Sequence, residues 1–158
     1  QLAAVNPPFD LARSDAPVFT RARFLPPSRI DRATIRQSLV ADGCMIEEGA
    51  VIENSIIGLR CLIGRDVTIR NSVLMGNDYY EPTDHAAEAK SNGLPPLGIG
   101  AGSLIEGAIV DKNCRIGRNV RVINSQGVDF TEENACGMIR DGVVVIPKGA
   151  ALPDGYAM

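Results

Sequence analysis

Aliphatic residues recur at a regular interval between Val40 and Leu74. Units of six, six and five residues alternate, so one full cycle takes seventeen residues. A small or β-branched residue stands four positions after most of the opening aliphatic residues, and Gly, Glu, Asp, Asn and Arg fill much of the space between. An internal repeat of this period is typical of a β-helix. The opening residues are Val40, Ile46, Ile52, Ile57, Ile63 and Ile69.

Each unit is interpreted as one short strand followed by a bend. The fourth position of a unit and the first of the next lie two residues apart, so their side chains point to the same side of an extended chain. Three units close a triangular coil, and successive coils stack their strands into parallel sheets. Val40, Ile57 and Leu74 then form one interior column. Burying each aliphatic side chain contributes about 1.5–3 kcal/mol, and one coil needs neighbours to hide its apolar faces.

The same repeat divides the rest of the chain. Residues 1–20 lack it, residues 18–25 are expected to form an extended strand that ends at Pro26-Pro27, and Ile30 and Ile35 lead into the first coil. After Leu74 the repeat stops, and it restarts at Ile99. This gap predicts one inserted loop at about residues 76–98, because a corner of the coil lets the chain leave and return at the surface.

Two further coils are expected after the insertion. Residues 110–122 form a fourth coil, and residues 143–152 form a last, partial one after a polar interval at residues 124–141. The expected fold class is therefore all-β, a parallel β-helix built from hexapeptide repeats with one inserted loop.

Composition and charge narrow the classes of partner. The 158 residues suffice for one domain, and the low aromatic content of 4% with no Trp suits a narrow interior. The net charge of −3 argues against a nucleic-acid partner. No apolar run approaches the roughly 18 residues of a membrane span, so no membrane partner is expected.

The cysteines fit the repeat better than they fit a metal site. Cys44, Cys61 and Cys114 each stand four residues after an opening aliphatic residue, where other units carry another small side chain. No Cys-x-x-Cys pair exists to bind a metal. We expect buried, reduced thiols, which suit a cytosolic compartment.

The sequence offers little catalytic chemistry. Gly98, Gly100 and Gly102 lack the Lys-Ser/Thr pair of a P-loop and are assigned to coil corners. His85 is the single histidine and falls in the inserted loop among carboxylates, where a solvated side chain is the simpler interpretation. Acyltransferases built from hexapeptide repeats use a histidine as general base, so an acyltransferase with His85 as the base remains an alternative. The carboxylate pairs at 47–48 and 132–133 are assigned to solvent.

Four basic residues are candidates for binding phosphate. Arg21 and Arg23 precede the repeat, Lys112 lies at a corner of the fourth coil, and Lys148 lies in the last one. Lys and Arg at corners are usually surface charges. Arg nevertheless offers a planar fork and Lys a point charge, and both groups suit phosphate oxygens.

Three separated motifs carry a family resemblance. They are Arg-Phe-Leu-Pro-Pro-Ser at 23–28, Met-Gly-Asn-Asp-Tyr-Tyr-Glu at 75–81 and Asp-Lys-Asn-Cys-Arg-Ile-Gly at 111–117. In this order they resemble the C-terminal domain of ADP-glucose pyrophosphorylase (glucose-1-phosphate adenylyltransferase), above all its cyanobacterial and plant branch. The resemblance covers the chain from Pro17 onward.

The resemblance implies a left-handed β-helix over residues 23–158, preceded by the tail of a catalytic domain and a linker over residues 1–22. The catalytic domain would transfer adenylyl from ATP to glucose 1-phosphate with magnesium, for glycogen or starch synthesis. The β-helix itself would hold no cofactor, metal or catalytic residue. The implied assembly is a homo- or heterotetramer in the bacterial cytoplasm or the plastid stroma.

Effector sites are implied by the same resemblance. Lys112 and Lys148 match the family's effector-binding lysines, and Arg23 matches an arginine of the same phosphate pocket. Arg21 stands where the family varies. The implied effectors are a phosphorylated carbon metabolite as activator and orthophosphate as inhibitor.

Some features depart from the family. Pro147 stands where the family carries an aliphatic residue, and its fixed φ bears on the direction of Lys148. The interval at 124–141 is also less similar. A Gly-rich nucleotide loop and a metal-binding aspartate pattern are absent, and the chain begins at Gln1. We therefore expect a fragment of a longer protein that is inactive alone. A pure assembly module is the non-enzymatic alternative.

Overall fold

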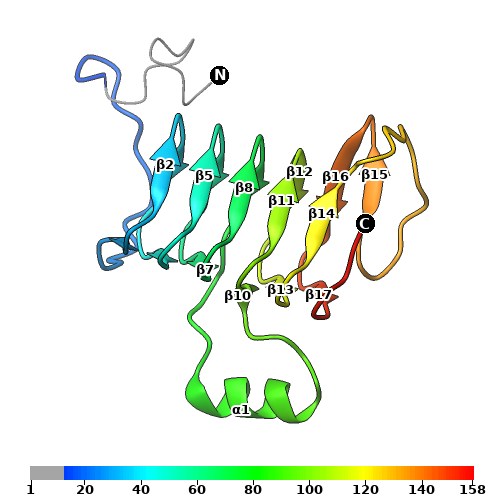
Figure 1. The fold of residues 1–158 in the computed structure, drawn as a ribbon. Coiled ribbons are helices and arrows are strands. Elements are labelled where there is room, and N and C mark those ends of the chain that lie inside the picture. Colours follow the sequence, from blue (N-terminus) through cyan, green and yellow to red (C-terminus); the bar gives the residue numbers. More distant parts are fainter. Residues whose placement is uncertain (1–12) are drawn as a thin grey trace.

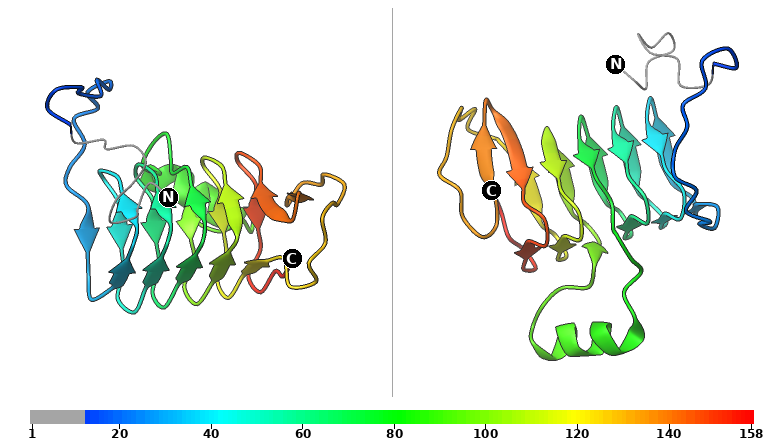
Figure 2. Two further views of the ribbon diagram at one scale, coloured as in Figure 1. Left: turned by 90° about the horizontal axis from the view of Figure 1, so that it is seen from above. Right: turned by 180° about the vertical axis from the view of Figure 1, so that it is seen from behind.

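The chain forms a triangular parallel β-helix in a computed structural model, which describes residues 13–158 (Figure 1). The first twelve residues of the expected tail lie outside the described residues. Strands succeed one another around three sides, and each coil stacks on the one before it (Figure 2). The expected coil architecture is confirmed.

Sheet A forms one side of the triangle and contributes one parallel strand to each coil. Its strands are β1 (Arg29–Ile30), β4 (Met45–Ile46), β7 (Leu62–Ile63), β10 (Gly98–Ile99), β13 (Arg115–Ile116) and β17 (Ala151–Leu152).

Sheet B forms the second side and comes after sheet A in each coil. Its strands are β2 (Thr34–Arg36), β5 (Val51–Glu53), β8 (Thr68–Arg70), β11 (Leu104–Glu106) and β14 (Arg121–Ile123).

Sheet C closes the triangle and ends with one antiparallel strand, β15, which pairs with β16. Its strands are β3 (Leu39–Val40), β6 (Ile56–Ile57), β9 (Val73–Leu74), β12 (Ala108–Val110), β16 (Val143–Ile146) and β15 (Met138–Arg140).

The interior consists of the expected aliphatic columns. Val40 is in register with Ile57 and Ile57 with Leu74, and Ile46 is likewise in register with Ile63. The interior side chains from the second coil onward are almost fully inaccessible to water. Cys44, Cys61 and Cys114 are buried and free, as expected, and Cys136 is free and half-buried.

The corners require left-handed backbone at residues other than glycine. Arg60 has φ 56°, Asp66 φ 56° and Asn113 φ 61°. This region is sterically costly for most side chains, and Asn, Asp and Gly adopt it most readily. Many of the polar residues between the repeated aliphatic positions therefore allow the left-handed backbone of the corners, in addition to facing solvent.

Several boundaries differ from the sequence expectations. The repeat begins one coil earlier, because Ile30 pairs with Ile46 and Ile35 with Ile52. Residues 18–25 form no strand, since they lie outside the coil and have no partner edge. The polar interval at 124–141 contains β15.

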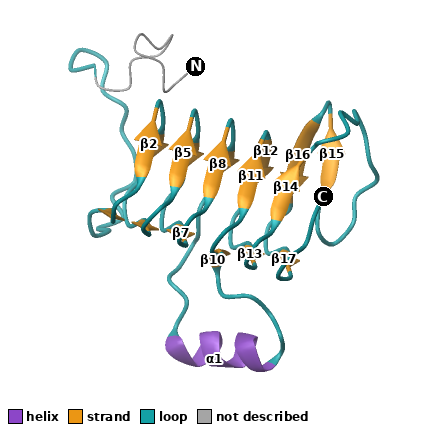
Figure 3. Cartoon of the chain, viewed as in Figure 1, coloured by secondary structure: helices purple, strands orange, loops and turns teal. Residues whose placement is uncertain are grey.

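The insertion is only partly a loop. It holds the helix α1 (Thr83–Ser91), which stands away from the coil (Figure 3). Gly98 is in strand β10 and not at a corner, with φ 110°. A Cβ there would lie 2.6 Å from the Leu62 carbonyl oxygen, so glycine allows the chain to rejoin the sheet closely. Within residues 13–158 no helix has the length and apolarity to cross a membrane.

Replacing Ile63 tests the inside–outside assignment. Ile63 is 1% exposed and is in register with Ile46 and Ile99 in sheet A. We predict that Ile63→Ala lowers the free energy of unfolding by about 2–5 kcal/mol, because a buried truncation leaves a cavity. Urea unfolding monitored by circular dichroism measures the loss.

Arg65→Ala is the matched control for this experiment. Arg65 is 64% exposed and makes one long ion pair with Glu48, so the expected loss is about 0.5 kcal/mol. Equal losses in the two variants would contradict the assignment.

Candidate functional site

Lys112 and Lys148 occupy the same corner position in adjacent coils. Each comes two positions after an interior residue, and these interior residues, Val110 and Ile146, are in register. The Gly149 N–H donates to the Lys112 carbonyl oxygen at 2.9 Å, which continues the ladder through the corner. Strands of one sheet are about 4.8 Å apart, so the two lysines are neighbours although they are distant in sequence.

Asp78 joins the two lysines. The Lys112 Nζ lies 2.8 Å from its Oδ1, and the Lys148 Nζ lies 3.0 Å from its Oδ2. The Asn113 Nδ2 also donates to Oδ2 at 3.1 Å. One carboxylate therefore accepts from two ammonium groups and an amide, and the three charged groups carry a net formal charge of one positive unit.

These contacts shift ionisation at the cluster. Hydrogen bonds from Lys112, then from Lys148 and Asn113, hold the pKa of Asp78 far below its ordinary range. The same carboxylate raises the pKa of Lys148. Asp78 and Lys148 are therefore both charged near neutral pH, and the pairs persist there.

The cluster contributes little to folding. The side chains of Asp78, Lys112 and Lys148 are 39%, 41% and 57% exposed. Solvent and salt screen ion pairs at such exposure, so they add little to the free energy of unfolding. Two cations are thus held together at a solvent-accessible corner whose fold does not depend on them, which is the arrangement that a multiply charged anion needs.

The corner ladder positions Asp78 before the chain leaves the coil. The Asn77 N–H donates to the Leu59 carbonyl oxygen, and its Nδ2 donates to the Arg60 carbonyl oxygen at 2.8 Å. The Asp78 N–H then donates to the Asn113 Oδ1 at 2.8 Å. Asp78 therefore lies one coil below Lys112 and two below Lys148, within reach of both side chains.

The far side of the insertion is anchored by a part-buried ion pair. Arg115 pairs with Glu81, whose side chain is 7% exposed, and the Leu97 N–H donates to the same carboxylate at 3.1 Å. Burial pulls the pKa of Glu81 upward, but Arg115 and the Leu97 N–H outweigh it, and the net shift is downward. The two contacts to one carboxylate therefore hold the ends of the insertion, at Glu81 and Leu97, close together.

Tyr80 extends the insertion toward the first coils. Its hydroxyl donates to the Gly43 carbonyl oxygen at 2.9 Å, and it sits so close to Gly43 that a Cβ there would overlap it. Tyr80 also lines a shallow groove of about 320 Å³ together with Pro26 and Pro27 of the first motif. The insertion thus contacts the lysine corner through Asp78 and the first coils through Tyr80, which shares a groove with the segment that comes after Arg23.

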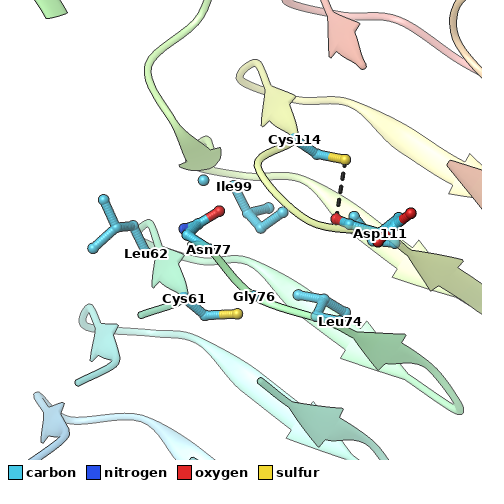
Figure 4. Close-up of a pocket in the computed structure, with 10 residues that line it drawn as sticks. Cys61, Leu62, Leu74, Gly76, Asn77, Ile99, Asp111 and Cys114 are labelled. Carbon is cyan, nitrogen blue, oxygen red and sulfur yellow. Dashed lines mark hydrogen bonds between the residues drawn. The ribbon is translucent and has the colours of Figure 1, made fainter. Parts of the chain in front are cut away.

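The interior behind the corner has no room for a ligand. Figure 4 shows Cys61, Leu74 and Cys114 around this space, with the Cys114 thiol hydrogen-bonded to the Asp111 carbonyl oxygen. The space has a volume of about 20 Å³. That volume holds about one water molecule. Burial raises the pKa of Cys114 to about 11, so its thiol is not a nucleophile near neutral pH. Any anion must bind on the outer face of the corner.

A family model described as the GLGC left-handed parallel beta-helix domain matches residues 23–157. The chain belongs to this family, the C-terminal domain of ADP-glucose pyrophosphorylase. The resemblance and the left-handed all-β fold expected from the sequence are thereby confirmed. A left-handed crossover between parallel strands is the uncommon hand, and spacing alone does not specify it.

The structure of this pyrophosphorylase domain brings together two of the four basic residues that are candidates for binding phosphate. Lys112 and Lys148 share Asp78, and Pro147 does not prevent Lys148 from reaching it. Arg21 and Arg23 are exposed, and within residues 13–158 neither side chain forms an ion pair. Their part in the site stays a prediction.

Sequence reasoning assigned no role to Asp78, Asn113 or Glu81. The sequence contains one indication for Asn113, because an asparagine next to Lys112 suits a corner that requires left-handed backbone. Asp78 and Glu81 had none beyond the family motif, because the insertion does not obey the repeat. His85 lies on an exposed face of α1, and no hydrogen bond or ion pair to its ring occurs in the part of the chain that the structure describes.

A carbon-13 NMR titration of the Asp78 carboxyl tests the cluster. Because Lys112, Lys148 and Asn113 stabilise the ionised form, we predict titration well below the ordinary value of 3.8. A lowered folded pKa means that the stabilisation is complete above the unfolded pKa and is lost as pH falls through the folded one.

Lys148→Gln is the matched variant for the titration. Removing one ammonium group should move the pKa of Asp78 back toward its ordinary value. A wild-type Asp78 that titrates at 3.8 or above would show that the cluster does not form in solution.

Proposed function

We propose that this chain is the regulatory and assembly domain of a glucose-1-phosphate adenylyltransferase and that its corner lysines bind phosphorylated effectors. The observation that carries the proposal is the convergence of Lys112 and Lys148 on one carboxylate. A phosphate monoester carries a charge of about −1.5 to −2 at neutral pH and three acceptor oxygens. It therefore matches two ammonium groups better than a single carboxylate does.

Arg23, and with less support Arg21, complete the proposed phosphate pocket. The support for Arg23 is its place in the family motif at 23–28, whose Pro26 and Pro27 line the groove under Tyr80. The Ser28 hydroxyl donates to the Ala41 carbonyl oxygen, which fixes the end of this segment to the coil. An arginine on the free side of that anchor lies where an upstream catalytic domain would join the β-helix.

Regulation would result from differential binding. An anion that binds more tightly to one arrangement of the catalytic domain and β-helix shifts the population toward that arrangement, typically by 1–3 kcal/mol. In this proposal a phosphorylated carbon metabolite activates, and orthophosphate inhibits by competing for the same cations.

Catalysis belongs, in this proposal, to the upstream domain, which would bind ATP and magnesium. No group of three or more His, Cys, Asp or Glu side chains within residues 13–158 is placed to hold a metal ion. The proposal therefore assigns no chemical step to the described residues.

The assembly part of the proposal is a homo- or heterotetramer. It is supported by the outer face of sheet C, where Leu39, Ile56, Val73 and Ile109 are in register along the coil. Ile109 is 38% exposed. Sheet faces that meet water usually carry polar side chains.

The acyltransferase alternative has no such support, because no observation assigns His85 a partner or a substrate.

Changing Lys148 in the longer enzyme that includes the catalytic domain tests the proposal. We predict that Lys148→Ala raises the activator concentration at half effect about tenfold or more, because a charge-assisted phosphate contact is worth about 1.5–3 kcal/mol. Initial rates of pyrophosphate release against activator concentration provide the measurement.

Lys90→Ala is the control for this assay. Lys90 lies in the last turn of α1, so the variant removes the same charge from the same chain away from the corner. An unchanged half-effect concentration in Lys148→Ala would remove Lys148 from the effector site.

A further inference from the structure

We infer that Asp78 is a tethered competitor for the lysine pair, which an incoming phosphate must displace and which sets the charge of the ligand that the corner accepts. This inference rests on the proposed effector role of Lys112 and Lys148. It assigns a selectivity function to a carboxylate of the insertion.

The contacts of Asp78 are those of a bound anion. Its Oδ1 accepts from Lys112 at 2.8 Å, and its Oδ2 accepts from Lys148 at 3.0 Å and from Asn113 at 3.1 Å. Both oxygens thus occupy positions that a phosphate oxygen would take. Because the carboxylate lies between the two ammonium groups, a phosphate that takes over these positions displaces it from both lysines.

The structure makes this carboxylate exchangeable. Asp78 is 39% exposed, whereas Glu81 in the same insertion is 7% exposed and bound to Arg115. The backbone on either side of Asp78 is held independently, by Asn77 in the corner ladder and by Glu81. The side chain of Asp78 can therefore leave the lysines by rotation, without unfolding the insertion.

Competition of this kind selects by charge. A ligand with a single carboxylate only replaces the Asp78 carboxylate with an equivalent group, so it gains no interaction energy. It also loses translational freedom on binding, whereas Asp78 is already tethered. A dianionic phosphate group brings more charge and a third oxygen, so it gains over the carboxylate that it displaces. Asp111 does not provide the same function, because its Oδ1 accepts a hydrogen bond from the backbone N–H of Lys112 and not from the ammonium group.

Neutralising Asp78 is the direct experiment. Calorimetric titration of the 158-residue chain with inorganic phosphate at low ionic strength compares wild type with Asp78→Asn. The asparagine keeps the shape and removes the competing charge, so we expect phosphate to bind about three- to tenfold more tightly, the value of two exposed ion pairs. Asp78→Glu, which keeps the charge, should remain close to wild type.

Two further variants separate the inference from its premise. Glu88→Gln removes one negative charge from α1, where it forms no ion pair among residues 13–158, and should leave phosphate binding unchanged. Lys148→Gln should abolish the gain when it is combined with Asp78→Asn. Circular dichroism melts of each variant establish that the coil is intact.

The outcomes are distinct. Lysine-dependent binding that tightens in Asp78→Asn but not in Glu88→Gln supports the inference. If Asp78→Asn binds phosphate no more tightly than wild type does, the inference is overturned and the proposed function stands. Weaker binding would make Asp78 a part of the site, and equal binding would give it no role there. Absence of phosphate binding in both wild type and Asp78→Asn overturns both.

Discussion

The backbone ladder between coils is the constraint on which the rest of the structure depends. Except for the terminal antiparallel strand β15, the strands pair in parallel with those of the neighbouring coils, as Ile46 does with Ile63 and Ile52 with Ile69. Because side chains on a strand alternate between faces, a slip of one residue would turn the interior column outward. The aliphatic residues therefore fix the register, and the register fixes which side chains meet at each corner.

The lysine corner is a consequence of that register. Lys112 and Lys148 come from different coils, and the pairing of Val110 with Ile146 makes them neighbours. The insertion leaves the coil at the same corner, so its first free carboxylate, Asp78, meets both cations. The coil thus brings charges from distant parts of the chain to one accessible corner, where they contribute little to folding.

The sequence predicts the segments that obey the repeat and little of the segments that depart from it. The columns through Val40 and Ile46, and the burial of three cysteines, are determined by period and side-chain size. Helix α1, β15 and the role of Gly98 lie outside the repeat or at its restart, where local sequence carries no periodic signal. The repeat predicts that both lysines lie at corners. The contact with Asp78 could not be predicted, because it depends on the path of the insertion.

A disulfide cross-link between the two corner positions tests the central claim most directly. Adjacent coils place equivalent residues about 4.8 Å apart, which lies within the Cα separation of a disulfide. The double variant Lys112→Cys/Lys148→Cys should form this bond under mild oxidation, as shown by peptide mapping with mass spectrometry. Lys112→Cys paired with Lys90→Cys on α1 should form no such bond. Failure of the 112–148 pair to cross-link in folded protein would contradict the register and, with it, the lysine corner.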